Sequence, residues 1–177
     1  LDSITRLARA YNVFADGSSG TILHYNGAAW TVQPSGVSAY TLQGVWSDSP
    51  GHAIAVGRGS KILRYDGTSW AAMGIGSLGS VELRAVWGSG PADIFAVGHK
   101  TNTSNGVILH YDGADWTISA TIAPTEDDGI VRLQDVWGSG PQDVFVVGTD
   151  GLILHYDGNA WTSMASPKAT ATMSTAS

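Results

Sequence analysis

The sequence contains no cysteine, which excludes disulfide bonds and thiolate metal ligands. Basic residues are also scarce: 9 Lys and Arg stand against 15 Asp and Glu, which gives a net charge of -6 at pH 7. A nucleic-acid-binding surface or a contact with anionic lipid needs a basic patch, so neither partner is expected. No apolar run approaches the ~20 residues that cross a bilayer, so no membrane span is expected either.

The chain is organised instead by a unit that occurs in four copies. The clearest copy, residues 133–161, reads LQDVWGSGPQDVFVVGTDGLILHYDGNAW, and related copies occupy residues 83–116, 42–70 and, in a shorter form, 11–30. The equivalent tyrosines lie 40, 46 and 45 residues apart, at Tyr25, Tyr65, Tyr111 and Tyr156. A period of roughly 40–50 residues that carries several short strands is typical of a β-propeller.

Each copy predicts four strands. In the clearest copy these are an alternating segment at 133–137, an apolar run at 143–148, a third strand at 152–156 and an outer strand from 161. Gly and Pro at 138–142 and an Asp-Gly pair after Tyr156 predict the turns. The chain is therefore expected to be an all-β propeller of four-stranded antiparallel blades over residues 1–165. The blades are expected at about 4–34, 42–75, 83–120 and 133–165, followed by a Ser/Thr/Ala-rich tail or linker at 166–177.

The sequence motif VWGSGPxDVFxVG…GxILHYDGxxW resembles the propeller repeats of bacterial surface and secreted proteins, especially long multi-repeat proteins of myxobacterial type. Its strand order is similar to that of WD40 repeats. Its YDGNAW segment is similar to the Asp box S-x-D-x-G-x-T-W, although its Asp, Gly and Trp are one residue closer together. The resemblance implies a propeller fold and a secreted or cell-surface location, which the low lysine content also favours. It implies no particular ligand.

Two kinds of assembly remain open at this level. Four blades is the lower end of the usual range of roughly 4–8. The four blades either close on themselves or form part of a ring, as a homodimer that completes an eight-bladed toroid or as part of a longer array.

The aromatic residues occupy fixed positions in the repeat. The three Phe share one position in the second strand, at Phe14, Phe95 and Phe145, and four of the seven Trp follow the hairpin turn, at Trp30, Trp70, Trp116 and Trp161. Both sets are interpreted as packing between blades. The remaining Trp, at Trp46, Trp87 and Trp137, end the first strand, and they are either packing residues or stacking platforms for sugar rings. In the second case the adjacent polar residues would bind sugar hydroxyls, namely Ser89, Ser139, Asp93 and Asp143.

Departures from the repeat are further candidates for function. Residues 99–105 lengthen one loop, and residues 121–129 are inserted between two copies; both are candidate recognition surface, with a merely tolerated loop as the alternative. Glu126, Asp127 and Asp128 offer oxygen ligands to Ca²⁺, but they lack the alternating spacing of an EF-hand, so an acidic surface loop is the favoured interpretation. The first copy lacks the WGSGP segment and carries a degenerate inner strand or a short helix in its place.

The sequence contains few arrangements of residues that could support catalysis. The three His of the third strand, His24, His110 and His155, are expected between blades, where they cannot converge on one metal ion. The repeated hairpin Asp residues have a backbone role in turns, and only two Glu are present. The sequence therefore predicts a non-catalytic module without cofactor or metal. It is expected to bind a protein partner through rim loops, with glycan binding between blades as the alternative.

Overall fold

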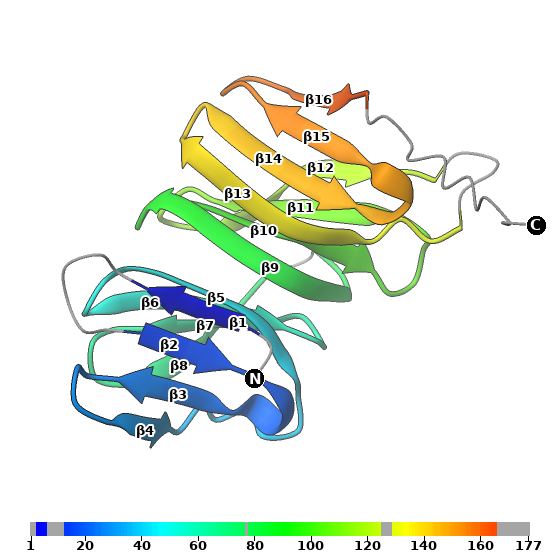
Figure 1. Ribbon diagram of the computed structural model, residues 1–177. Coiled ribbons are helices and arrows are strands. Elements are labelled where there is room, and N and C mark those ends of the chain that lie inside the picture. The colour runs from blue at the N-terminus through cyan, green and yellow to red at the C-terminus, as the bar shows by residue number, and fades with distance from the viewer. Residues whose placement is uncertain (1–2, 7–12, 77, 125–128, 166–177) are drawn as a thin grey trace, which may run out of the picture.

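The computed structural model describes residues 3–6, 13–76, 78–124 and 129–165, and all four repeats fold as four-stranded antiparallel sheets (Figure 1). Each sheet, or blade, uses four consecutive strands in chain order. Blade 1 comprises β1 (Ser3–Arg6), β2 (Val13–Asp16), β3 (Ile22–Tyr25) and β4 (Trp30–Gln33). Blade 2 comprises β5 (Leu42–Ser49), β6 (His52–Gly57), β7 (Lys61–Tyr65) and β8 (Trp70–Met73). The predicted all-β propeller architecture is confirmed.

Blades 3 and 4 repeat this pattern. Blade 3 comprises β9 (Val81–Gly90), β10 (Asp93–Lys100), β11 (Gly106–Tyr111) and β12 (Trp116–Ile122). Blade 4 comprises β13 (Leu133–Gly140), β14 (Asp143–Gly148), β15 (Ile153–Tyr156) and β16 (Trp161–Met164). Short 3-10 turns join the second and third strands of blades 1 and 4, at η1 (Ser18–Gly20) and η2 (Thr149–Gly151).

The inner strands are longer than the sequence predicts. The Gly-Ser-Gly segment after the inner Trp was expected to turn, but β9 and β13 continue through it to Gly90 and Gly140. A register shift between Gly138 and Gly140 accommodates one extra residue opposite β14. Glycine tolerates such a bulge, so the strand bends there without ending. The prediction of a turn was therefore wrong for this segment.

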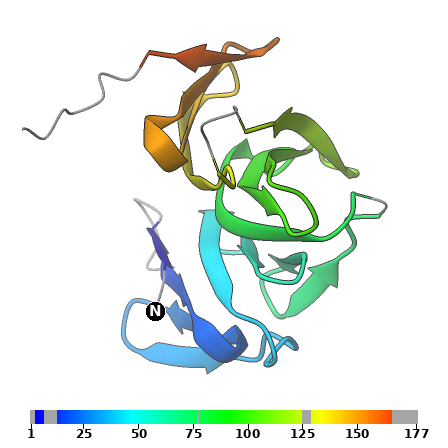
Figure 2. The same ribbon diagram turned by 90° about the vertical axis from the view of Figure 1, so that its right-hand side faces the viewer.

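The blades follow one another around an arc, with blades 1 and 4 at its ends (Figure 2). The inner strands lie side by side, β1 next to β5, β5 next to β9, and β9 next to β13. Three separate apolar clusters fill the spaces between consecutive blades. Since a single sheet cannot bury both of its faces, these three interfaces hold the chain together.

One aromatic arrangement recurs at these interfaces. Phe14 of blade 1 packs edge-on against Trp70 of blade 2, with ring centroids 5.5 Å apart. Phe95 of blade 3 meets Trp161 of blade 4 in the same way at 5.7 Å. Between blades 2 and 3, Ile54 takes the place of Phe in the buried cluster. The predicted packing role of the Phe set and the hairpin Trp set is confirmed at these positions.

The hairpin Asp residues stabilise their own turns, as predicted. Asp66 Oδ1 accepts hydrogen bonds from the backbone N–H groups of Ser69 and Thr68, both at 2.8 Å. These bonds favour the ionised carboxylate and hold the pKa of Asp66 below its ordinary value. Asp112 and Asp157 make the same bonds, and the pKa of each is lowered for the same reason.

The departures from the repeat fall in three places. The first copy forms an inner strand, β1, where the sequence left strand and helix open. The extra residues at 99–105 lengthen the β10–β11 hairpin, which Lys100 N–H closes on the Asn105 carbonyl at 2.9 Å. Residues 125–128, which include the proposed calcium ligands Glu126, Asp127 and Asp128, lie outside the described residues.

Candidate functional site

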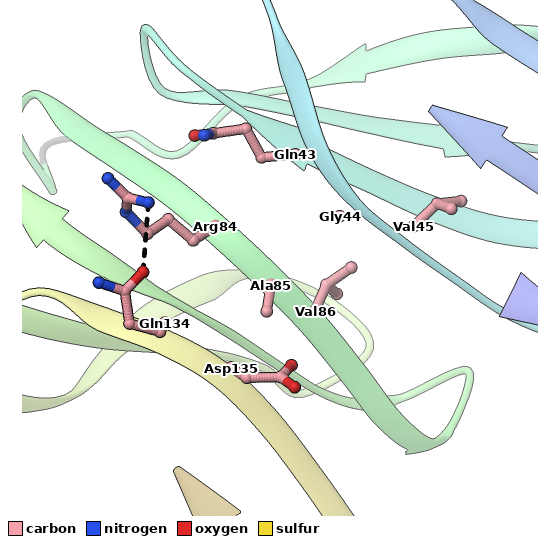
Figure 3. A pocket seen from close by; sticks show the side chains of 8 residues that line it. All are labelled: Gln43, Gly44, Val45, Arg84, Ala85, Val86, Gln134 and Asp135. Carbon is pink, nitrogen blue, oxygen red and sulfur yellow. Dashed lines mark hydrogen bonds between the residues drawn. The ribbon is translucent and has the colours of Figure 1, made fainter. Parts of the chain in front are cut away.

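A polar cavity of about 320 Å³ lies over the inner strands of blades 2, 3 and 4 (Figure 3). Each of these strands contributes neighbouring residues to it, and the lining consists of Gln43, Gly44, Val45, Arg84, Ala85, Val86, Gln134 and Asp135. The cavity therefore faces the axis around which the blades are arranged, which is a common location for ligand sites in ring-shaped folds. The long polar side chains occupy the same position in successive repeats, one residue after the buried Leu that begins each motif.

Arg84 is the central side chain of this cavity. Its Nη1 donates to Gln134 Oε1 at 3.2 Å. Within the described part of the chain, Arg84 Nε and Gln43 Oε1 are both buried and have no hydrogen-bond partner. A buried donor or acceptor without a partner costs about 1–3 kcal/mol, so each atom favours a ligand that satisfies it. The lining of the cavity thus contains one unsatisfied donor and one unsatisfied acceptor.

The cavity lining contains one basic and one acidic side chain, Arg84 and Asp135. His99, which is buried on the neighbouring strand β10, lies 3.9 Å from Glu82. Burial lowers the pKa of His99, and the charges of Arg132, Arg84 and Arg58 lower it further, against the opposing effect of Glu82. In the cavity lining, the Arg84 guanidinium is the group that can donate to a carboxylate or carbonyl oxygen of a ligand.

The polar residues predicted to bind sugar hydroxyls bond to one another instead. Ser89 donates to Asp93, and His110 Nε2 donates to the other Asp93 oxygen at 2.7 Å. Phe95 then stacks on the His110 ring, with centroids 4.5 Å apart. Because the serine donates to the carboxylate and not to the imidazole, this group lacks the geometry of an activated nucleophile. Its contacts are those of a structural network within the blade.

Blade 4 contains the same network. Ser139 donates to Asp143, and His155 Nε2 lies 2.8 Å from Asp143 Oδ1. These two hydrogen bonds hold the pKa of Asp143 below its ordinary value. Phe145 stacks on His155 at 4.5 Å. All of these contacts of His110 and His155 lie within one blade, so they do not test the prediction that the side chains lie between blades.

Blade 2 exchanges the positions of acid and imidazole. Asp48 stands where the other blades have Ser89 and Ser139, and His52 stands where they have Asp93 and Asp143. His52 Nδ1 and Asp48 Oδ1 are 2.9 Å apart, so the pair closes the turn after β5. His52 thus has a structural role in this turn.

The three first-strand tryptophans lie in separate blades. The Trp46 ring rests on Gly88 of the next blade, where an added Cβ would lie 2.8 Å from the ring. Trp87 rests on Gly138 in the same manner, at 2.6 Å. Trp137 is 61% exposed. Trp46 and Trp87 therefore have packing partners, and Trp137 alone offers an open ring face.

The sequence argument missed the Arg84 cavity. The available signal was a polar residue at the same repeat position in three copies, Gln43, Arg84 and Gln134. Because side chains alternate between the two faces of a strand, the residue after each buried Leu lies on the other face of the inner strand. That face is turned toward the axis around which the blades are arranged. Only the curvature of the arc brings the three positions together.

Two features are absent from the described residues, a metal-binding cluster and a membrane-spanning helix. No group of three or more His, Cys, Asp or Glu side chains is placed to hold a metal ion among them. In the same part of the chain, no helix has the length and apolar character needed to cross a membrane.

Comparison with known proteins gives structural matches. No protein-family model matches the sequence, and no curated protein matches it. The structure is similar to YCF48 from Cyanidioschyzon merolae, a β-propeller protein, with a TM-score of 0.69 and 17% identity over 94% of this chain and 56% of that chain. It is also similar to a structure of YCF48 bound to D1 peptide, with a TM-score of 0.53 and 14% identity over 92% of this chain and 80% of that chain.

These likenesses establish the propeller fold of the present chain. The chain spans just over half the length of the Cyanidioschyzon merolae protein.

Proposed function

We propose that this propeller is a non-catalytic interaction module that binds an extended peptide segment of a partner protein in the Arg84 cavity. The observation that carries the proposal is the pair of buried atoms without partners, Arg84 Nε and Gln43 Oε1, on neighbouring inner strands. We also propose, from the composition and the repeat, that the module acts at a cell surface or outside the cell.

A peptide supplies the two groups that the cavity lacks. A backbone N–H donates to the Gln43 oxygen, and a carbonyl or carboxylate oxygen accepts from the Arg84 guanidinium. Figure 3 shows both side chains directed to the same side of their strands, together with Gln134. An acidic side chain or a C-terminal carboxylate in the peptide could form a bidentate ion pair with Arg84. The similarity to a YCF48 structure that contains a peptide adds support at the level of the fold.

The experiment is a selection of peptides from a random library displayed with free C-termini, followed by affinity measurements on synthetic peptides. We expect enrichment of acidic peptides. We expect Arg84→Met to weaken their binding by about 10–100-fold, because a hydrogen bond to a charged group contributes roughly 1.5–3 kcal/mol.

The matched control is Arg64→Met, which removes the same charge from an exposed position on β7. It should leave the affinity within about twofold, since surface charges contribute little. Equal binding by Arg84→Met and the unaltered chain would refute the cavity as the site. Loss of binding on deletion of residues 101–105 alone would place the site in the rim loop.

Carbohydrate binding remains a second candidate because of one observation, the exposed ring of Trp137. An aromatic face of this kind suits the apolar side of a sugar ring. Retention on a glycan array that is lost in Trp137→Ala, with an unchanged melting temperature, would support it. Retention that persists in Trp137→Ala would exclude this residue as the platform.

A further inference from the structure

The long polar side chains of the Arg84 cavity belong to β-bulges. In blades 2, 3 and 4, the inner strand has one residue more than the stretch of second strand opposite it, and the pairing skips that residue. The skipped residues occupy the same repeat position and are Gln43, Arg84 and Gln134. Bulges redirect side chains and are frequent next to functional sites. A repeated feature of the backbone thus directs all three polar side chains to the cavity.

The packing of each inner strand requires its bulge. Residues three apart in a regular strand lie on opposite faces of the sheet. Leu83 and Val86 are three apart, yet both are buried in the same apolar cluster. The equivalent residues are buried together in the other two clusters, namely Leu42 with Val45 and Leu133 with Val136. The extra residue restores the phase of the strand, so two consecutive residues between Leu and Val are left for the cavity.

A glycine opposite each bulge lets the two strands approach. Gly98 pairs with Leu83 beside the bulge, and an added Cβ on Gly98 would collide with the Glu82 carbonyl oxygen. An added Cβ on Gly57 would collide with the Thr41 carbonyl oxygen in the same way. The Val-Gly pair that ends the second strand of the repeat therefore maintains the bulge. The residues of the bulge itself are free to differ between blades.

The second residue of each bulge differs between the three blades. It is Gly44 in blade 2, Ala85 in blade 3 and Asp135 in blade 4, and all three line the cavity. Gly44 has to be small, because an added Cβ would lie 3.0 Å from both the Cα of Ala85 and the carbonyl oxygen of Arg84. Asp135 is exposed and lies beside Ala85 (Figure 3). Blade 4 therefore adds a carboxylate to the cavity at a position where the other blades have no functional group.

Arg84 and Asp135 have opposite charges and line one cavity, but they do not neutralise each other. Within the ranges that the structure describes, no ion pair joins them. Arg84 Nη1 donates instead to the uncharged Gln134, and Asp135 Oδ1 accepts from the backbone N–H of Val136 at 2.9 Å. These contacts hold the two charges apart. Each charge is therefore available to an opposite charge of a ligand.

We infer that the cavity selects a peptide segment with both charges, an acidic residue that binds Arg84 and a Lys or Arg that binds Asp135. The inference rests on the proposed peptide-binding function and adds the residue that determines its specificity. A volume of about 320 Å³ is at the lower end of the range of ligand pockets, roughly 300–1,000 Å³, so the cavity holds the side chains of one or two residues. The acidic and basic residues are therefore expected next to each other or one residue apart in the peptide. A second acidic residue there would face Asp135, and like charges repel.

The test repeats the selection from the displayed random library on Asp135→Asn and Asp135→Lys beside the unaltered chain. The unaltered chain should enrich Lys or Arg within two positions of an acidic residue. Asp135→Asn should lose this preference, and Asp135→Lys should reverse it toward a second acidic residue. In synthetic peptides, replacement of the basic residue by Gln should weaken binding to the unaltered chain by about two- to fivefold, because exposed ion pairs contribute little. The same replacement should have no effect on binding to Asp135→Asn.

The matched control is Asp115→Lys, which makes the same charge change at an exposed position in the β11–β12 hairpin turn, outside the cavity lining. It should keep the preference of the unaltered chain. Asp135→Asn is the conservative variant, since its amide oxygen can still accept the Val136 N–H. Circular dichroism and the urea midpoint of each variant establish that it is folded.

The outcomes separate this inference from the function on which it rests. Weaker binding by Arg84→Met, together with Asp135 variants that keep the charge preference of the unaltered chain, would overturn the inference and leave the proposed function in place. Unchanged binding by Arg84→Met, or a selection that enriches no peptide, would overturn both. A reversal of the preference by Asp135→Lys that Asp115→Lys does not share would support Asp135 as the specificity-determining residue.

Discussion

The repeated phenylalanine allows one residue type to be tested in two environments of the same chain. Phe95 is 1% exposed and lies within 6 Å of three aromatic rings, those of His110, Tyr156 and Trp161. Phe145 occupies the same repeat position, but within the described residues it has one aromatic neighbour, His155, and it is partly exposed. Phe95→Ala and Phe145→Ala should therefore lower the free energy of unfolding by different amounts.

The magnitudes follow from burial. Truncation of a buried Phe to Ala costs about 3–5 kcal/mol, and aromatic pairs add about 0.5–1.5 kcal/mol beyond area, which places Phe95→Ala near the upper end. Phe145→Ala removes a partly hydrated ring, so about half of that cost is expected. The free energy of unfolding should thus fall by about 2 kcal/mol more for Phe95→Ala. Against a typical total of about 5–15 kcal/mol, this gap is measurable.

The assay is equilibrium unfolding in urea at about 1 μM, monitored by tryptophan fluorescence and circular dichroism. Coincident transitions by the two probes are needed, because repeat proteins can lose cooperativity. Equal destabilisation by the two variants at this concentration would refute the assignment of Phe145 to an uncovered face.

Three further outcomes are expected. Gly138→Ala should lower the free energy of unfolding by about 1–3 kcal/mol, because the added Cβ would meet the Trp87 ring at 2.6 Å; an unchanged urea midpoint would contradict this packing. The pKa of Asp112 is lowered by backbone hydrogen bonds in its turn, so the ionised carboxylate stabilises the fold above pH ~4, and this stabilisation is lost as the pH falls through the lowered pKa. Asp112→Asn should therefore reduce the acid dependence of the melting temperature. An unaltered pH profile of the melting temperature would argue against this role of Asp112. Asp48→Ala and His52→Ala should show a coupling of at least about 0.5 kcal/mol in a double-mutant cycle, whereas additive effects would mean that the 2.9 Å contact contributes nothing.

The architecture could be predicted because each repeat carries its local signals in order. Alternation toward Trp87, the apolar run through Phe95 and the Asp-Gly pair after Tyr111 each specify a strand or a turn over a few residues. Because the same signals occur in four copies, the assignment of strands and turns is less ambiguous than it would be from one copy. The inner strands were predicted to end too early only where glycines permit both a turn and a bulge, and cross-strand pairing with β14 decided between them.

The candidate site could not be predicted in the same way. Arg84 and Gln43 are 41 residues apart in the sequence and belong to different repeats. Their shared cavity depends on the angle between blades, which is set by the packing of Trp46 on Gly88 and by the buried clusters on either side. The Ser89–Asp93–His110 network also had to be seen in three dimensions, because nothing in the sequence distinguishes a serine bonded to its own blade from one that faces a ligand.

By itself, the sequence determined the number of blades, the strands of each and the residues that pack between them, because short-range patterns and repetition specify these features. Only the tertiary structure decided which of the repeated residues are covered. Phe95 and Phe145 are equivalent in the repeat, as are Trp70 and Trp30, yet Phe95 and Trp70 are buried while Phe145 is partly exposed and Trp30 is exposed. The physical reason is that a blade buries its face only by packing against a neighbouring blade, and that packing is a tertiary contact.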